Sequence, residues 1–269
     1  MKEPTIAYNY LEDYLTEIRS QGRYAFTWEE IKDKFSLSDK ALNQNLYRLK
    51  SKNKVAQVRK EFYAIITPEY MRQGMLPPSL FIDDMMKSLK RRYYIGLISA
   101  AALYGAAHQQ PMEYFVVTER PALRAIKNKK LKINFFVKKE WSDEDVIQKR
   151  TDAGYINVSS PELTALDLLY YLETIGLNRA LTILQELSAE IKVTNLVKVA
   201  KRYPQTVAIQ RLGYLLDKEL HNHKFAEPLL KVLNDRRYFP LSLSLSKNSE
   251  GEIDSQWKVI KNTTLESDL

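Results

Sequence analysis

Apolar residues in the first part of the chain recur at the spacing of an amphipathic helix. Between residues 5 and 20 they stand at successive spacings of four, three, one and three positions, which places them on one helix face. These residues are Ala7, Leu11, Tyr14, Leu15 and Ile18. Gly22 follows and can end the helix. The pattern predicts a first helix over residues 5–20 that buries one face.

Two further helix starts follow after a short extended segment. Thr27 and Glu30 have the spacing of a capping box, in which each side chain bonds to the backbone N–H of the other residue. Ser38 can cap a third helix with its side-chain oxygen. The apolar stripe of that third helix consists of Leu42, Leu46 and Leu49. We therefore expect two helices in close succession before residue 53.

Two short apolar runs come next, Val55–Val58 and Phe62–Thr67, on either side of a charged turn. Such runs around a polar turn predict a β-hairpin. Helix, short strand, helix, helix and hairpin is the element order of a winged helix-turn-helix, a DNA-binding unit. The first part of the chain is therefore predicted to be a winged helix-turn-helix.

The best candidate for a linker lies between Met71 and Leu80. One Gly and two Pro in this stretch break every periodic pattern. Each side of the break has its own set of apolar residues, which predicts a separate core on each side. We therefore expect a winged helix-turn-helix domain over residues 1–78 and a second, larger domain over residues 79–269.

The larger part mixes helical and strand patterns. Helices are expected over 81–90 and 93–107, strands over 114–118, 131–137 and 155–159, and further helices over 161–176, 178–190, 194–202, 206–220 and 226–234. The polar end from Lys247 is expected to fray, although Trp257–Ile260 has the composition of a strand. The fold class predicted for the whole chain is α+β, with a larger mixed α/β domain that is rich in helices.

Composition narrows the class of protein. The chain of 269 residues has 45% hydrophobic content, which suits a globular protein. It has no Cys, which excludes disulfides, thiolate zinc sites and cysteine nucleophiles and fits a reducing cytoplasm. Residues 1–10 lack the basic and apolar regions of a signal peptide, and the uncharged stretch 93–112 is too polar to span a membrane. We expect a cytoplasmic protein without a membrane partner.

The net charge of +8 favours an anionic partner, and the third helix is the best place for it. Arg, Asn and Gln can read base edges, and Lys and Tyr can hold phosphate. Opposite the leucine stripe the helix carries Lys40, Asn43, Gln44, Tyr47 and Arg48, and the basic run continues with Lys50, Lys52, Lys54, Arg59 and Lys60. The residues predict a DNA interface; the alternative is a merely solvated helix face.

A second basic stretch lies in the larger part of the chain. It contains Arg120, Arg124, Lys127, Lys129 and Lys130, and continues to Lys132, Lys138 and Lys139. The first five are candidates for additional phosphate contacts. The alternative is that these residues keep loops and strand edges soluble.

Catalytic and metal sites have little support in the sequence. His108, His221 and His223 lack the spacing of a metal site, and the paired carboxylates stand where they can cap helices. No phosphate-binding glycine motif and no nucleophile motif is present. We expect no catalytic residue, no metal and no cofactor.

Two segments carry a resemblance to a known family. They are Tyr93–Pro111, with the apolar run Phe115–Thr118 after it, and Gly154–Asp167. Through them the chain resembles the AbiEi-type antitoxins of bacterial abortive-infection systems over about residues 5–240. The resemblance includes the layout of the family, in which a winged helix precedes a larger antitoxin domain.

The resemblance implies a non-catalytic antitoxin of a type IV toxin-antitoxin system that gives phage resistance. Its partners would be a nucleotidyltransferase toxin, neutralised without a stable complex, and inverted repeats in the promoter of its own operon, which it represses. Polar candidates for antitoxin activity in the matching segment are Tyr94, Tyr104, His108, Gln109 and Gln110. The same residues could instead satisfy the end of a buried helix.

An enzyme remains the alternative to an antitoxin. A nuclease needs only a few scattered carboxylates and a Lys, so missing motifs do not exclude a nuclease-like enzyme that a winged helix directs to nucleic acid. Metal-dependent cleavage of DNA or RNA by the purified protein would favour this alternative.

Overall fold

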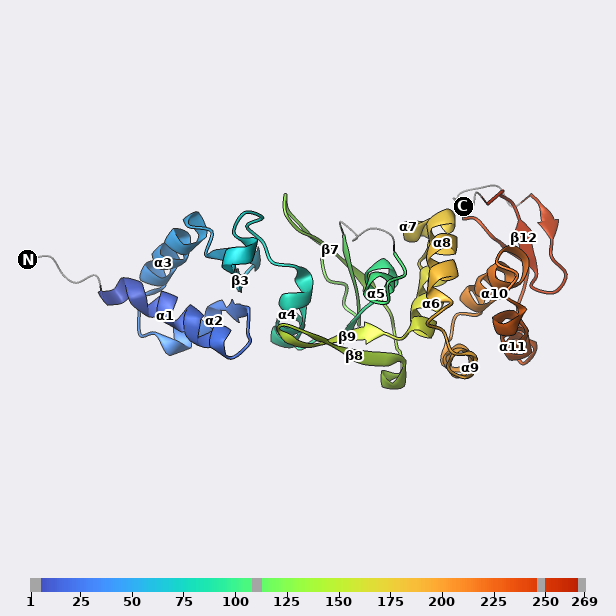
Figure 1. Ribbon diagram of the computed structural model, residues 1–269, viewed down its shortest axis with the longest axis horizontal. Coiled ribbons are helices and arrows are strands. Elements are labelled where there is room, and N and C mark those ends of the chain that lie inside the picture. Colours follow the sequence, from blue (N-terminus) through green and yellow to red (C-terminus); the bar gives the residue numbers. More distant parts are fainter. Residues whose placement is uncertain (1–5, 108–112, 246–249, 266–269) are drawn as a thin grey trace, which may run out of the picture.

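The structure is a computed structural model that describes residues 6–107, 113–245 and 250–265. The molecule is elongated (Figure 1). Three N-terminal helices lie at one end, a six-stranded sheet lies in the middle, and a group of helices lies at the other end. The mixture of helices and strands confirms the α+β class.

The N-terminal part contains three helices and a three-stranded antiparallel sheet with the order β1-β3-β2. Its elements are α1 Ile6–Ser20, β1 Ala25–Thr27, α2 Trp28–Lys34, α3 Asp39–Ser51, β2 Val55–Arg59 and β3 Phe62–Ile65. Thr27 and Glu30 form the expected capping box, and the side chain of Ser38 caps α3. The elements follow the predicted order of helix, strand, helix, helix and hairpin.

A mixed sheet forms the middle of the molecule, with the strand order β6-β7-β5-β4-β9-β8. Its strands are β4 Tyr93–Ile95, β5 Tyr114–Thr118, β6 Ile126–Lys127, β7 Lys132–Val137, β8 Val146–Thr151 and β9 Gly154–Ser159. The short helices around it are η1 Pro68–Tyr70, η2 Pro78–Leu80, α4 Ile82–Ser88, α5 Leu97–Leu103 and η3 Asp143–Asp145. The three strands expected from apolar runs are present as β5, β7 and β9.

The prediction of a helix over residues 93–107 is wrong for its first residues. Residues 93–95 form β4, which pairs antiparallel with β5 and parallel with β9. All three side chains are buried. Gly96, directly after β4, is tightly packed: a Cβ atom at this position would lie 3.0 Å from Cγ2 of Val117. The uncharged run is thus split into a central strand and a short helix, because pairing with distant strands overrides its local pattern.

The predicted linker is packed rather than open. Met75, Leu76 and Leu80 are 7%, 2% and 7% exposed. They belong to one hydrophobic cluster that joins the N-terminal sheet to α4 and the six-stranded sheet. Its members from the N-terminal side include Ala25, Val58, Phe62, Ala64 and Ile66, and those from the other side include Met85, Ile95, Val116, Ile133 and Val158. The N-terminal part also keeps a core of its own, which includes Leu11, Phe26 and Leu46. The irregular stretch therefore adds a shared hydrophobic cluster between the two parts, and the proposed division at residue 78 stays a prediction.

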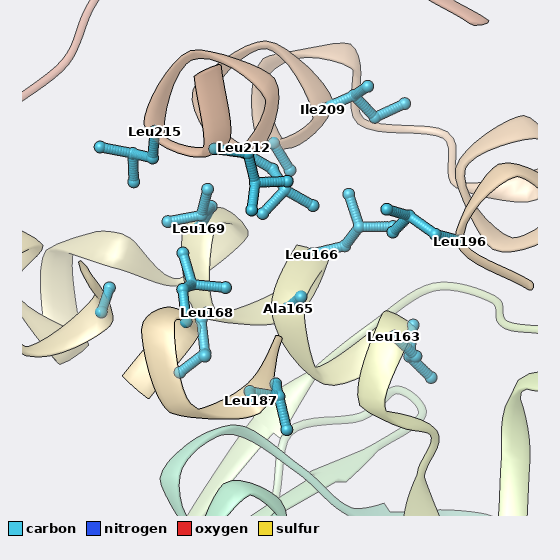
Figure 2. Close-up of a cluster of buried hydrophobic side chains, with 14 of the residues drawn as sticks. Leu163, Ala165, Leu166, Leu168, Leu169, Leu187, Leu196, Ile209, Leu212 and Leu215 are labelled. Carbon is cyan, nitrogen blue, oxygen red and sulfur yellow. The ribbon is translucent and has the colours of Figure 1, made fainter. Parts of the chain in front are cut away.

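The remaining helices are grouped around α6 at the other end of the molecule (Figure 1). They are α6 Pro161–Tyr170, α7 Leu172–Ile175, α8 Leu177–Leu187, α9 Val193–Arg202, α10 Thr206–Tyr214, the π-helix η4 Leu215–Glu219 and α11 His223–Asn234. Helix α6 is buried over nearly its whole length. Figure 2 shows Leu166, Leu168 and Leu169 of α6 among side chains from the surrounding helices, such as Leu187, Leu196 and Leu212, which belong to the same hydrophobic cluster.

The segment after α11 packs against the helices instead of fraying. It forms a small sheet of β10 Leu241–Ser242, β11 Glu252–Ile253 and β12 Val259–Lys261. Trp257 is fully buried, and its indole N–H donates to Asp217 at 3.0 Å. The ring lies on Gly213, where a Cβ atom would come within 1.9 Å of it. The expected fraying is therefore wrong for residues 250–265, because Trp257 fills a site on α10.

Candidate functional site

Helix α3 presents the predicted reading face to solvent. Leu42, Leu46 and Leu49 are buried, as the stripe predicts. On the other side Lys40, Asn43, Gln44, Tyr47 and Arg48 are all exposed, and Tyr47 reaches 71% exposure. The amphipathic pattern has thus placed on one exposed face the side chains that the sequence predicts to contact bases and phosphates.

The rest of the first basic run is partly engaged within the protein. Lys54 forms an ion pair with Glu12 at 2.6 Å. Lys50 donates to the side chain of Gln57 at 3.3 Å. Lys60 lies 3.7 Å from Glu61 in the two-residue turn between β2 and β3. Lys52 is exposed and Arg59 is half-buried. The charge of this run is therefore less available than its sequence indicates.

The second basic stretch is exposed and reaches the N-terminal part. Its five candidates, Arg120, Arg124, Lys127, Lys129 and Lys130, are all exposed. A Cβ atom on Gly74 would lie 2.1 Å from Nζ of Lys130 and 3.7 Å from Oδ1 of Asn53. The turn between β6 and β7 therefore lies beside the segment that follows α3.

A third group of basic residues escaped sequence reasoning. Lys87, Lys90, Arg91 and Arg92 stand at the end of α4 and the start of β4. The guanidinium of Arg91 donates to the backbone carbonyls of Arg120 and Pro121. This contact joins the third group to the second stretch. The signal in the sequence was the short run Lys90-Arg91-Arg92 itself.

One member of the second stretch, Lys138, is not on the surface. Its side chain is 2% exposed, and Nζ lies 2.6 Å from Oδ1 of the fully buried Asp167. The phenol of Tyr94 donates to Oδ2 of Asp167 at 2.6 Å, and that of Tyr203 donates to Oδ1 at 2.7 Å. We call Tyr94, Lys138, Asp167 and Tyr203 the buried polar cluster.

The buried polar cluster joins four separate elements: β4, the end of β7, α6 and the end of α9. Burial, and after it the negative charge of Asp167, raises the pKa of Tyr94 and of Tyr203 well above the ordinary tyrosine value. Both phenols thus remain donors. With three donors on one buried carboxylate, the arrangement fits a tie between elements better than a metal ligand.

The other antitoxin candidates divide into two groups. Tyr104 is half-buried and donates to the backbone carbonyl of Ser159 at 2.7 Å, while Nζ of Lys149 lies 4.0 Å from the centre of its ring. It lines a cleft of about 430 Å³ together with Glu162 and Arg202. His108, Gln109 and Gln110 lie outside the described residues. The role of all five in antitoxin activity stays a prediction.

Among the described residues, no cluster of three or more His, Asp or Glu side chains is arranged to hold a metal ion. None of the described helices combines the length and the apolar composition that a membrane span requires.

Comparison with known proteins gives a family match within the larger part of the chain. No curated protein gives a significant match. The crystal structure of the RV2827C protein from Mycobacterium tuberculosis has a similar fold, with a TM-score of 0.68 and 16% identity over 97% of this chain and 92% of that chain. Residues 94–218 match the model of the AbiEi antitoxin C-terminal domain. Residues 94–218 therefore resemble the AbiEi antitoxin C-terminal domain, and the predicted resemblance to AbiEi-type antitoxins is confirmed over this part of the chain.

Proposed function

We propose that this protein is the antitoxin of a type IV abortive-infection system, which neutralises a nucleotidyltransferase toxin and represses its own operon. The observation that carries the proposal is the AbiEi antitoxin domain over residues 94–218. The open basic face of α3 supports a second role in binding DNA. In this proposal the protein acts in the cytoplasm, without catalysis and without a cofactor.

For the repressor role, residues 1–78 act as a winged helix-turn-helix on inverted repeats of the promoter. Helix α3 enters the major groove, where Arg48 and Gln44 contact base edges. The exposed Lys129 and Lys130 in the β6–β7 turn add phosphate contacts, which the place of Lys130 beside Gly74 and the segment after α3 supports. Phosphate contacts position the protein and base contacts give specificity.

Arg48→Ala and Gln44→Ala are each expected to weaken binding to the promoter by about 1–3 kcal/mol, because each removes a paired contact with a base. Gel shifts with promoter and scrambled duplexes measure this loss. Lys129→Ala is the matched control: it should weaken both duplexes alike and reduce the slope of log affinity against log salt by about 0.9. Unchanged promoter affinity in both α3 variants would show that α3 is not the recognition helix.

Neutralisation of the toxin is assigned to residues 79–269, which contain the AbiEi domain. The full-length Arg48→Ala variant is therefore expected to protect cells fully while it fails to repress the promoter. Growth of cells that express the toxin from a heterologous promoter measures protection apart from repression. Loss of protection in this variant, or a stable stoichiometric complex of antitoxin and toxin, would contradict the proposal.

A further inference from the structure

A second cleft opens at the start of β4, away from α3. It has a volume of about 420 Å³ and lies between α4, β4 and the β8–β9 hairpin. Small-molecule sites in proteins commonly measure about 300–1,000 Å³. The side chains that matter below are Lys87, Arg91, Arg92, Trp141, Gln148 and Asn157.

An arginine stacked on a tryptophan forms one wall of this cleft. Cζ of Arg92 lies 4.9 Å from the centre of the Trp141 ring. The ring of Tyr94 contacts Trp141 edge-on, with 5.2 Å between ring centres, and so fixes the indole from the core side. A guanidinium plane and an indole are the surfaces on which nucleobases stack. The wall is therefore suited to a flat aromatic ligand.

The carboxylate that now pairs with Arg92 is easily replaced. Nη2 of Arg92 lies 2.5 Å from Oδ1 of Asp143, but the two side chains are 52% and 86% exposed. An exposed ion pair of this kind contributes little to stability. Two oxygens of a tetrahedral phosphate can meet a guanidinium as the two oxygens of a carboxylate do, with more negative charge, and Arg binds them through two parallel hydrogen bonds. Arg92 can therefore exchange Asp143 for a phosphate at small cost.

Further positive charge lies at the rim. Nζ of Lys87 lies 2.6 Å from Oδ2 of Asp83, and the side chain of Lys87 is 74% exposed. Arg91 is held in place by its two bonds to the carbonyls of Arg120 and Pro121. The rim thus attracts an anion, and Lys87 is open enough to turn towards it.

Two side-chain amides line the cleft on neighbouring strands. Gln148 in β8 and Asn157 in β9 are direct cross-strand partners. Neither amide forms a hydrogen bond to another part of the chain within the described ranges 6–107, 113–245 and 250–265. Each offers one acceptor and two donor hydrogens, which is the pattern that pairs with the edge of a nucleobase.

We propose that this cleft binds a nucleotide. The phosphate takes the place of Asp143 on Arg92 with help from Lys87, the base packs on the wall of Arg92 and Trp141, and its edge faces Gln148 and Asn157. The nucleotide is either free or one unit of a single strand, since both present the same phosphate and base. The site is separate from α3 and does not depend on operator binding.

Calorimetric titration of the full-length protein with the four nucleoside 5′-monophosphates and with inorganic phosphate tests the proposal. At least one monophosphate is expected to bind with a Kd below about 1 mM and at least about tenfold more tightly than phosphate, because the base adds its own contacts. A six-nucleotide single strand separates the two sources. Binding more than tenfold tighter than the monophosphate assigns the site to a strand, and equal binding assigns it to a free nucleotide.

Variants of residues inside and outside the cleft lining show whether binding takes place in this cleft. Arg92→Gln should weaken the monophosphate about tenfold, because it removes a charge-assisted contact. Lys90→Gln removes the same charge from the same basic group outside the cleft lining and should change little. Asp143→Asn removes the competing carboxylate and should tighten binding a few-fold. Gln148→Met should change the order of preference among the four bases. All four variants should bind promoter duplex as the parent protein does.

Three results would overturn the proposal. The first is that none of the monophosphates binds. The second is that phosphate binds as tightly as the best monophosphate, which would leave only an anion site. The third is that Arg92→Gln and Lys90→Gln lose the same affinity, which would reduce the effect to net charge.

Discussion

Lys138→Met is expected to lower the free energy of unfolding by about 3–5 kcal/mol, because it leaves the buried Asp167 without its opposite charge. Asp167 is fully buried and keeps only neutral phenols as partners in this variant. Urea denaturation followed by circular dichroism measures the loss. A loss of this size would show that the buried polar cluster stabilises the packing of the sheet against the helices.

Lys34→Met provides the matched control for this measurement. Lys34 pairs with Glu17 at 2.9 Å, but the two side chains are 45% and 52% exposed. Such a surface pair contributes about 0–1 kcal/mol. If Lys138→Met costs no more than Lys34→Met, the carboxyl of Asp167 tolerates its site without the lysine and the role assigned to the ion pair is wrong.

Removal of residues 1–78 is expected to unfold the remaining chain or to make it aggregate. The cut takes away one side of the shared hydrophobic cluster, namely Ala25, Val58, Phe62, Ala64, Ile66, Met75 and Leu76. The five larger side chains among them contribute about 1.5–3 kcal/mol each when fully buried, so the loss is on the order of 10 kcal/mol. That is comparable with the whole stability of a protein, about 5–15 kcal/mol.

Thermal unfolding of the 79–269 fragment, compared with the full chain, checks this expectation. Phe62→Ala in the full chain is the milder companion, since it should lower the melting temperature of the whole molecule in a single transition. A fragment that melts cooperatively at the temperature of the full chain would show that the two parts are independent. The proposed roles of residues 1–78 and 79–269 are for this reason better separated by point variants than by truncation.

The N-terminal elements were predictable because their signals are local. The capping box of Thr27 and Glu30 and the stripe of Leu42, Leu46 and Leu49 involve residues within one or two helical turns. In contrast, Tyr93–Ile95 reads as the start of a helix in the sequence and becomes a strand through pairing with β5 and β9. Strand β8 was not predicted, since its run of polar residues lies at an exposed sheet edge.

The candidate sites divide in the same way. The face of α3 follows from helical periodicity, so its exposed residues could be named from the sequence. The buried polar cluster could not, because its members come from four elements that are distant in the chain. Lys138 in particular stands in a run of lysines and has the sequence pattern of a surface residue. In the structure its side chain is buried, because it forms an ion pair with the buried Asp167.

The contact between Gly213 and Trp257 also bears on the order in which the protein is made. Helix α10 leaves the ribosome before the segment that carries Trp257, so the surface of α10 at Gly213 lacks its indole cover during that interval. The hydrogen bond from the indole N–H to Asp217 also cannot form until then. The helical part of the molecule therefore closes late in synthesis, and an interrupted chain would present an apolar surface that chaperones and proteases recognise.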